Sequence, residues 1–251
     1  MTPVPPGFPG MPQRFAPRAV ALEEFGTLCQ ETAALLGAAP ARLLGLFLVV
    51  YLPVQLLSGI PYAAKPLRLA IASIGLAGFF VALEAVRSGR VPGLLNMLVP
   101  WRLAPGKLIL LAVSGLLPLL CVLLFWWLDL GWDAVDNFLG GPPPADGMGL
   151  RQQIEFELAF NLSGAPLLFV QPLCVLYTWS ASRSLSADLL AVAANWRWAL
   201  GLALISIPID MGLGAFDSGS VPEMLLSLLA DIGIEMAMGA FTFVLLQRSL
   251  R

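Results

Sequence analysis

Two carboxylates stand one helical turn apart in a strongly apolar stretch near the end of the chain. Asp231 and Glu235 occur in EMLLSLLADIGIEMAMGAFTFVLLQ, and residues with this spacing share one face of a helix. A carboxylate inside a bilayer costs about 2.5–3.5 kcal/mol on insertion scales and therefore faces protein or water. The pair indicates a polar cavity, a proton or cation site, or a partner with a complementary charge. A purely structural pair, hydrogen-bonded to polar groups such as Gln55, Gln171 or Ser206, is the open alternative.

The chain lacks the residues that most enzyme mechanisms need. It contains no histidine, which excludes Ser-His and Cys-His catalytic pairs and histidine-ligated metals. Cys29, Cys121 and Cys174 have no close spacing and fit small apolar side chains better than a disulfide framework. The sequence also contains no phosphate loop, dinucleotide fingerprint or HExxH motif. We therefore expect no enzyme, no catalytic residue, no cofactor and no metal.

The elements that position the carboxylate pair belong to a membrane protein. The 251 residues are 58% hydrophobic and only 12% charged, whereas soluble domains carry about 25% charged residues. The mean hydropathy is +0.83. The net charge of −2 argues against a nucleic-acid partner, because phosphate binding needs a concentrated basic surface.

The apolar stretches predict the fold class. A membrane-spanning helix needs about 20 mostly apolar residues, and six stretches meet that length. We predict an all-α, polytopic membrane helical bundle of six transmembrane helices plus interfacial amphipathic helices. Pro166, Pro172 and Pro208 are expected to kink the fourth and fifth spans. The six stretches are residues 43–60, 67–86, 108–128, 158–180, 199–216 and 224–247.

The rest of the chain divides by composition. Residues 1–18 are proline-rich and predict a disordered tail, and residues 19–37 alternate apolar and acidic positions as an amphipathic interfacial helix does. Residues 38–251 form the six-helix transmembrane domain. The connection 87–107 mixes basic and apolar residues and predicts a short helix beside anionic lipid headgroups.

Charge predicts the orientation. With both termini in the cytoplasm, only Lys65, Arg68 and Arg151 of the 14 basic residues lie outside, as the positive-inside rule requires. Glu157 is assigned to an acidic outer loop, and Asp210 to the hydrated outer end of the fifth helix. The alanine- and leucine-rich composition suggests a bacterium, so we expect the bacterial inner (cytoplasmic) membrane.

The stretch PLLFVQPLCVLYTWSASRSLSADLLAVAANWRWALGLALI follows an apolar helix with serine-rich turns, a short helix, an Asn-Trp pair and a new span. Together with the basic loop after the second helix, it resembles the uncharacterised six-helix inner-membrane proteins of the YciC-like kind in bacteria. The resemblance implies the fold. It carries over no catalytic residue.

Three functions are compatible with these observations. The first is a non-enzymatic accessory or interaction subunit of an envelope assembly, whose partners are the lipid bilayer and either another protein or a second copy of this chain. The second is a small transporter or channel that uses Asp231 and Glu235. The third is an immunity-type protein against a membrane-targeting toxin.

Overall fold

The computed structural model describes residues 15–56, 62, 64–140, 149–215 and 221–250, and in these ranges it contains helices and no strand. The predicted all-α fold is confirmed. The helices are α1 (Phe25–Gly37), α2 (Pro40–Leu56), α3 (Ala64–Arg87), α4 (Leu94–Leu98), α5 (Pro105–Leu130), α6 (Trp132–Gly140), α7 (Leu150–Gly164), α8 (Val170–Leu176), α9 (Ala181–Ala194), α10 (Trp196–Ala215) and α11 (Val221–Ser249), with 3-10 helices at Leu22–Glu24, Pro100–Arg102 and Ala165–Leu167.

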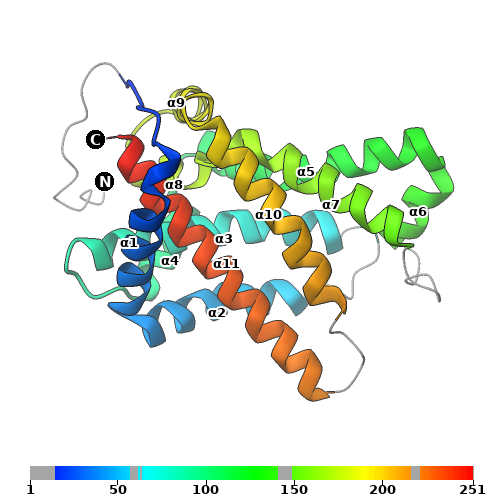
Figure 1. Cartoon of the computed structure of the whole chain (residues 1–251), viewed down its shortest axis with the longest axis horizontal. Helices are drawn as coiled ribbons and strands as arrows, with labels where there is room; N and C mark the ends of the chain where they lie inside the picture. Colours follow the sequence, from blue (N-terminus) through cyan, green and yellow to red (C-terminus); the bar gives the residue numbers. More distant parts are fainter. Residues whose placement is uncertain (1–14, 57–61, 63, 141–148, 216–220, 251) are drawn as a thin grey trace.

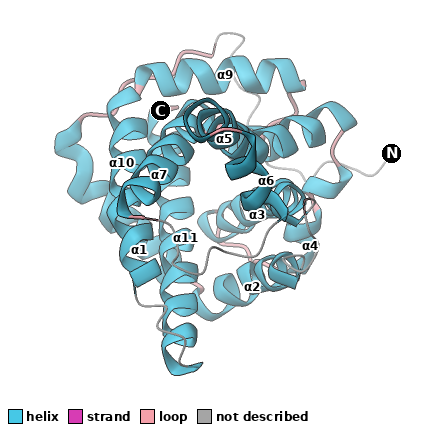
Figure 2. Cartoon of the chain, turned by 90° about the vertical axis from the view of Figure 1, so that its right-hand side faces the viewer, coloured by secondary structure: helices cyan, strands magenta, loops and turns pink. Residues whose placement is uncertain are grey.

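The two ends of the described chain meet. The Arg18 amide donates to the Ser249 carbonyl over 2.8 Å, and Figure 1 shows both termini at one end of the bundle with α6 at the other. We call these the terminal end and the distal end. The connection that contains α4 lies at the terminal end, and α9 crosses the bundle there almost at right angles to the long helices (Figure 2).

Four stretches of helix are long and apolar enough to cross a membrane: α3, α5, α7 continued into α8, and α11. The helices α2 and α10 reach that length only together with α1 and α9, from which they are bent by 84° and 86°. The described residues thus provide four spans, or up to six if each bent pair is one span. The steep bend before α2 is compatible with the predicted interfacial position of α1, which stays a prediction.

The surface of α5 is apolar on the side away from the bundle. Ile109 and Leu128 are 63% and 72% exposed, while Leu111 and Val122 on the packed side are fully buried. Large aliphatic side chains exposed along a whole helix are costly in water. Lipid removes that cost, so this surface supports a position inside a bilayer.

The fourth predicted span differs from the structure. Helix α7 begins at Leu150, so residues 150–157 are helical and not part of the outer loop. The helix breaks at the 3-10 helix Ala165–Leu167, where Pro166 stands, because proline lacks the N–H that a continuing helix needs. By contrast, α10 continues through Pro208. Pro166 thus stands in a short interruption of the helix, whereas Pro172 lies inside α8. The predicted kinks themselves stay predictions.

The short buried helix α8 is held by a charged side chain at each end. At its start the Asp188 carboxylate of α9 accepts a hydrogen bond from the Phe169 amide over 2.7 Å. At its end the Lys107 ammonium of α5 donates to the carbonyls of Cys174 and Tyr177 over 2.7 and 2.6 Å. These charges match the positive and negative ends of the helix dipole. Asp188 and Lys107 thus stabilise the half-helix that follows the break.

Packing is unequal along the bundle. Near the terminal end α3 and α11 bury a dense apolar core that includes Phe79, Phe80, Phe243 and Leu246. Towards the distal end α7 has no buried residue, and the buried positions of α10 lie in its first half. The terminal half is therefore closed by apolar side chains. At the distal end α5 and α6 bury a smaller cluster of Val122, Trp126 and Val135, while the described side chains of α7 and of the second half of α10 are only partly buried or exposed.

Candidate functional site

The predicted pair lies near the middle of α11. Asp231 is half-buried and accepts a hydrogen bond from the Tyr51 hydroxyl of α2. The Tyr51 ring stacks on Phe47, which in turn meets Phe79 of α3 edge-on at 5.5 Å between ring centroids. Aromatic packing therefore positions the phenol that binds the carboxylate.

Glu235 has an exposed side chain, so the direction in which it points decides its role. The other exposed positions of this part of α11 are 226, 229, 233 and 237, and at 3.6 residues per turn they form a stripe on the opposite side of the helix. Charged groups of α3, α10 and α11 itself lie within electrostatic range of Glu235. Glu235 therefore faces the bundle, while the opposite stripe faces lipid.

Two further carboxylates approach the pair from other helices. The Asn161 side-chain amide of α7 donates to Glu157 Oε2 over 3.1 Å and to Asp210 Oδ2 of α10 over 3.5 Å. Asp210 in turn interacts electrostatically with Asp231. We call Glu157, Asp210, Asp231 and Glu235 the acidic row.

The acidic row corrects two predictions. Glu157 lies within α7 and not in an outer loop. Asp210 is half-buried against Asn161, so it is more than a hydrated helix end. Both predictions placed a helix end beside the carboxylate, because a charged residue in an apolar sequence usually marks the end of a membrane span.

The expected partners of the pair are also different. Gln171 donates to Ser73 Oγ over 3.0 Å, and Ser206 donates to the Leu202 carbonyl of its own helix. The side chain of Gln55 lies outside the described residues. Arg68 of α3 acts electrostatically on Glu235; the sequence placed it at the outer end of the second predicted span.

The acidic row connects three helices. Asp210 stands in the distal part of α10, and Asp231 and Glu235 stand near the middle of α11. Carboxyl and phenol groups can accept and pass on protons, and the Asn161 amide holds two of the carboxyl groups by hydrogen bonds. Among the described residues no group of three His, Cys, Asp or Glu side chains is arranged to hold a metal ion.

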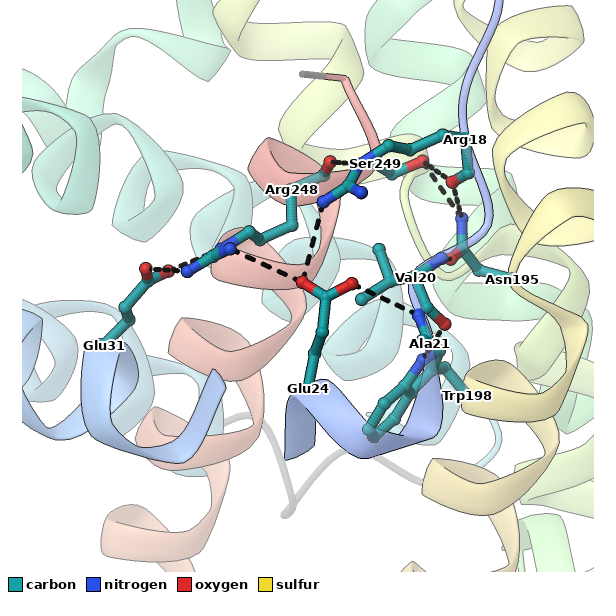
Figure 3. Close-up of polar contacts among 9 residues, drawn as sticks. All are labelled: Arg18, Val20, Ala21, Glu24, Glu31, Asn195, Trp198, Arg248 and Ser249. Atoms are coloured by element: carbon teal, nitrogen blue, oxygen red, sulfur yellow. Dashed lines mark hydrogen bonds and ion pairs between the residues drawn. The ribbon is translucent and has the colours of Figure 1, made fainter. Parts of the chain in front are cut away.

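A second set of polar residues ties the chain termini together at the terminal end (Figure 3). Asn195, which is 2% exposed, is its centre. Its Oδ1 accepts from the Val20 amide over 2.8 Å, and its Nδ2 donates to the carbonyls of Arg18 and Ala191 and to Ser249 Oγ. The junction of α9 and α10 thus holds both ends of the chain.

Ion pairs and an indole complete this terminal network. Arg248 of α11 pairs with Glu31 of α1 and, over 3.4 Å, with Glu24. The Trp198 indole N–H donates to the Val20 carbonyl over 2.9 Å. Arg18 therefore belongs to the folded structure, although the sequence assigned it to the tail. Phe15 of the same predicted tail packs edge-on against Trp179, and residues 1–14 lie outside the described residues.

The sequence did not single out Tyr51, Asn161, Asp188 or Lys107. The first two are single polar side chains inside predicted spans, and their depth in the span was the signal that could have identified them. Lys107 stands at the edge of a span and Asp188 in the connection between two spans, where charged residues are common. Only the packing of α8 against both residues gives them a role.

Comparison with protein-family models, curated proteins and solved structures yields no match. The resemblance to the YciC-like proteins therefore stays an expectation, and the geometry described above carries the functional argument.

Proposed function

We propose that this chain is a bacterial inner-membrane protein whose terminal end is cytoplasmic. The distribution of basic residues supports this orientation. Arg42 at the start of α2, Arg90 and Arg102 beside α4, and Arg183 in α9 lie near the terminal end, whereas Arg151 lies at the start of α7 near the distal end. Positive charge on the cytoplasmic side is the rule for such proteins.

We further propose that the protein is a small transporter that binds and carries protons through the acidic row. The observation that supports it is the chain of contacts between carboxyl groups of α7, α10 and α11. Asn161 bridges Glu157 and Asp210, and Asp210 lies within electrostatic range of Asp231 and Glu235. Each carboxyl group in an apolar span lowers the stability of a membrane helix, so four carboxyl groups linked in this way favour a functional reason over a structural one.

The packing supports a proposal about the end of the bundle from which protons reach the acidic row. The described side chains of α7 and of the second half of α10, which include Glu157 and Asp210, are only partly buried or exposed, while apolar side chains close the terminal half. Protons would reach Glu235 from the distal side, and release at the terminal side would require the core around Phe243 to open. The terminal network, which ties α1, α10 and α11 together, would hold that side closed. No covalent chemistry is part of this proposal.

The test is proton flux in sealed proteoliposomes that contain a pH-sensitive dye, with the membrane potential clamped by potassium and valinomycin. The wild-type protein is expected to dissipate a pH gradient faster than empty liposomes. Asp231→Asn and Glu235→Gln keep the side-chain shape but remove the titratable group, so each is expected to abolish the flux while the folded protein elutes unchanged.

The matched control is Asp133→Asn, an exposed carboxylate of α6 outside the acidic row, which should leave the flux unchanged. Equal flux in the wild type and in both isosteric variants would refute the proposal and favour the structural alternative. The same conclusion would follow if wild-type liposomes lost the gradient no faster than empty ones, and an accessory role would then be preferred.

A further inference from the structure

The connection between α3 and α5 folds back along the bundle instead of extending away from it. Helix α4 lies against α3 so closely that a Cβ atom at Gly78 would stand 2.7 Å from the Met97 Cα. Met97 is 3% exposed, and the flanking Pro92 and Pro100 are buried. Gly78 lies more than two helical turns before the end of α3 at Arg87. The helix α4 is thus a rigid element fixed beside the terminal half of α3.

The outward side of this element is apolar. Leu95 and Leu94 are 72% and 58% exposed, and Val91 and Trp101 are 71% and 48% exposed. The fixed backbone holds these side chains away from the core, and no segment in the described part of the chain covers them. Side chains of this kind next to a membrane-spanning helix suit the boundary between acyl chains and headgroups.

Basic groups flank the apolar side chains. Arg87 forms an ion pair with Glu84, with 2.8 Å between Arg87 Nε and Glu84 Oε2. Arg90 and Arg102 are exposed, and within the described ranges neither forms an ion pair. The described chain from Ser88 to Gly106 contains no acidic residue that could neutralise them.

We propose that α4 with Arg90 and Arg102 is a binding surface for an anionic phospholipid. The guanidinium groups would pair with the headgroup charge, and Leu94, Leu95 and Trp101 would contact the upper part of the acyl chains. Arginine is suited to this task because its planar fork binds phosphate through two hydrogen bonds. The proposal is independent of proton transport, since it uses none of the acidic row.

The experiment is native mass spectrometry of the full-length protein in mild detergent, titrated with phosphatidylglycerol or with phosphatidylcholine of the same acyl chains. The wild type is expected to bind phosphatidylglycerol more tightly. The double variant Arg90→Gln/Arg102→Gln should lose roughly tenfold or more of that affinity, because each basic residue near a membrane surface contributes about 1 kcal/mol. Its affinity for phosphatidylcholine should change little.

Three comparisons sharpen the test. Arg90→Lys/Arg102→Lys keeps the charge and should retain most of the preference, and Arg183→Gln, an exposed arginine of α9, should retain all of it. Leu94→Ser/Leu95→Ser should weaken binding of both lipids alike. If the double glutamine variant fails to fold, Arg90→Gln and Arg102→Gln are measured singly, and each should lose about fivefold.

The proposal is overturned if the wild type binds both lipids equally, or if the glutamine variants bind phosphatidylglycerol as the wild type does. Displacement of phosphatidylglycerol by an equal concentration of inorganic phosphate would also overturn it, because the apolar side of α4 would then contribute nothing.

Discussion

The terminal network gives a quantitative prediction for Asn195. Replacing it by alanine removes the acceptor of the Val20 amide and the donors to the Arg18 carbonyl and to Ser249 Oγ. Each hydrogen bond contributes about 1 kcal/mol net, and a buried amide without a partner adds its own cost. We expect Asn195→Ala to lower the free energy of unfolding by about 3 kcal/mol.

A loss of that size should be visible in thermal unfolding of the purified protein in mild detergent. For a protein of this length it lowers the unfolding midpoint by roughly 6–12 °C. Asn195→Asp should be at least as destabilising, because it places a carboxylate against the Arg18 and Ala191 carbonyls. The matched control is Asn137→Ala, an exposed asparagine of α6, which should change the free energy by less than about 0.5 kcal/mol.

Release of the N-terminal segment provides a second measurement. Arg18 is held through both its amide and its carbonyl, so trypsin should cleave after it slowly in the wild type and faster in Asn195→Ala. If the variant unfolds within about 2 °C of the wild type and is cleaved after Arg18 at the wild-type rate, Asn195 does not organise the terminal network.

Three further predictions concern residues that the packing identifies. Lys107→Met leaves two carbonyls at the end of α8 without a donor and should lower the free energy of unfolding by about 2–3 kcal/mol, measured by thermal unfolding. At the start of α8, Asp188→Asn should lower it less than Asp188→Leu does, because the amide keeps an acceptor for the Phe169 N–H. Gly78→Ala forces a Cβ against the backbone of α4 and should lower the unfolding midpoint, whereas Gly45→Ala, which meets nothing within 4 Å, should leave it unchanged or raise it. Tyr51→Phe removes one donor and should cost no more than about 1.5 kcal/mol in unfolding, but it should shift the pH dependence of proton flux in liposomes.

Local patterns predicted the helical fold and the shared face of Asp231 and Glu235, since both follow from spacing along one helix. The partners of the pair were not predictable in the same way. Tyr51 precedes Asp231 by 180 residues, and its proximity depends on how α2 packs against α11. The sequence contains no signal for that packing.

The same limit applies to the tryptophans. Tryptophan is enriched at the two membrane interfaces, and Trp101, Trp127 and Trp196 are exposed. Trp198, however, is 7% exposed and binds the Val20 carbonyl. Trp126 is 5% exposed and packs edge-on against Phe138. A tryptophan at the end of a span suits lipid and a protein contact equally well, so only the tertiary structure separates the two.

Pro166 stands at a helix break and Pro208 lies inside a helix, and the residues before each proline differ. At the break after α7, the Ser163 hydroxyl donates to the carbonyls of Ala159 and Phe160 over 2.6 and 3.0 Å, and Gly164 precedes Pro166. Such side-chain bonds to the preceding turn bend helices. Before Pro208 the Ser206 hydroxyl makes the same kind of bond to the Leu202 carbonyl, yet Pro208 remains inside α10. The local difference is therefore the glycine two residues before Pro166, since Ser206 stands at that position before Pro208.

The side of the membrane from which Glu235 can be labelled decides whether the acidic row opens towards the distal end. The exposed Cys29 and the half-exposed Cys121 are first replaced by serine, and Glu235→Cys is then labelled in sealed vesicles with a membrane-impermeant thiol reagent. We predict labelling from the distal side at least about ten times faster than for Ala240→Cys, which is fully buried, or for Leu229→Cys, which lies on the lipid-facing stripe. Labelling from the terminal side alone, or at a rate no higher than that of Leu229→Cys, would contradict an acidic row that opens towards the distal end.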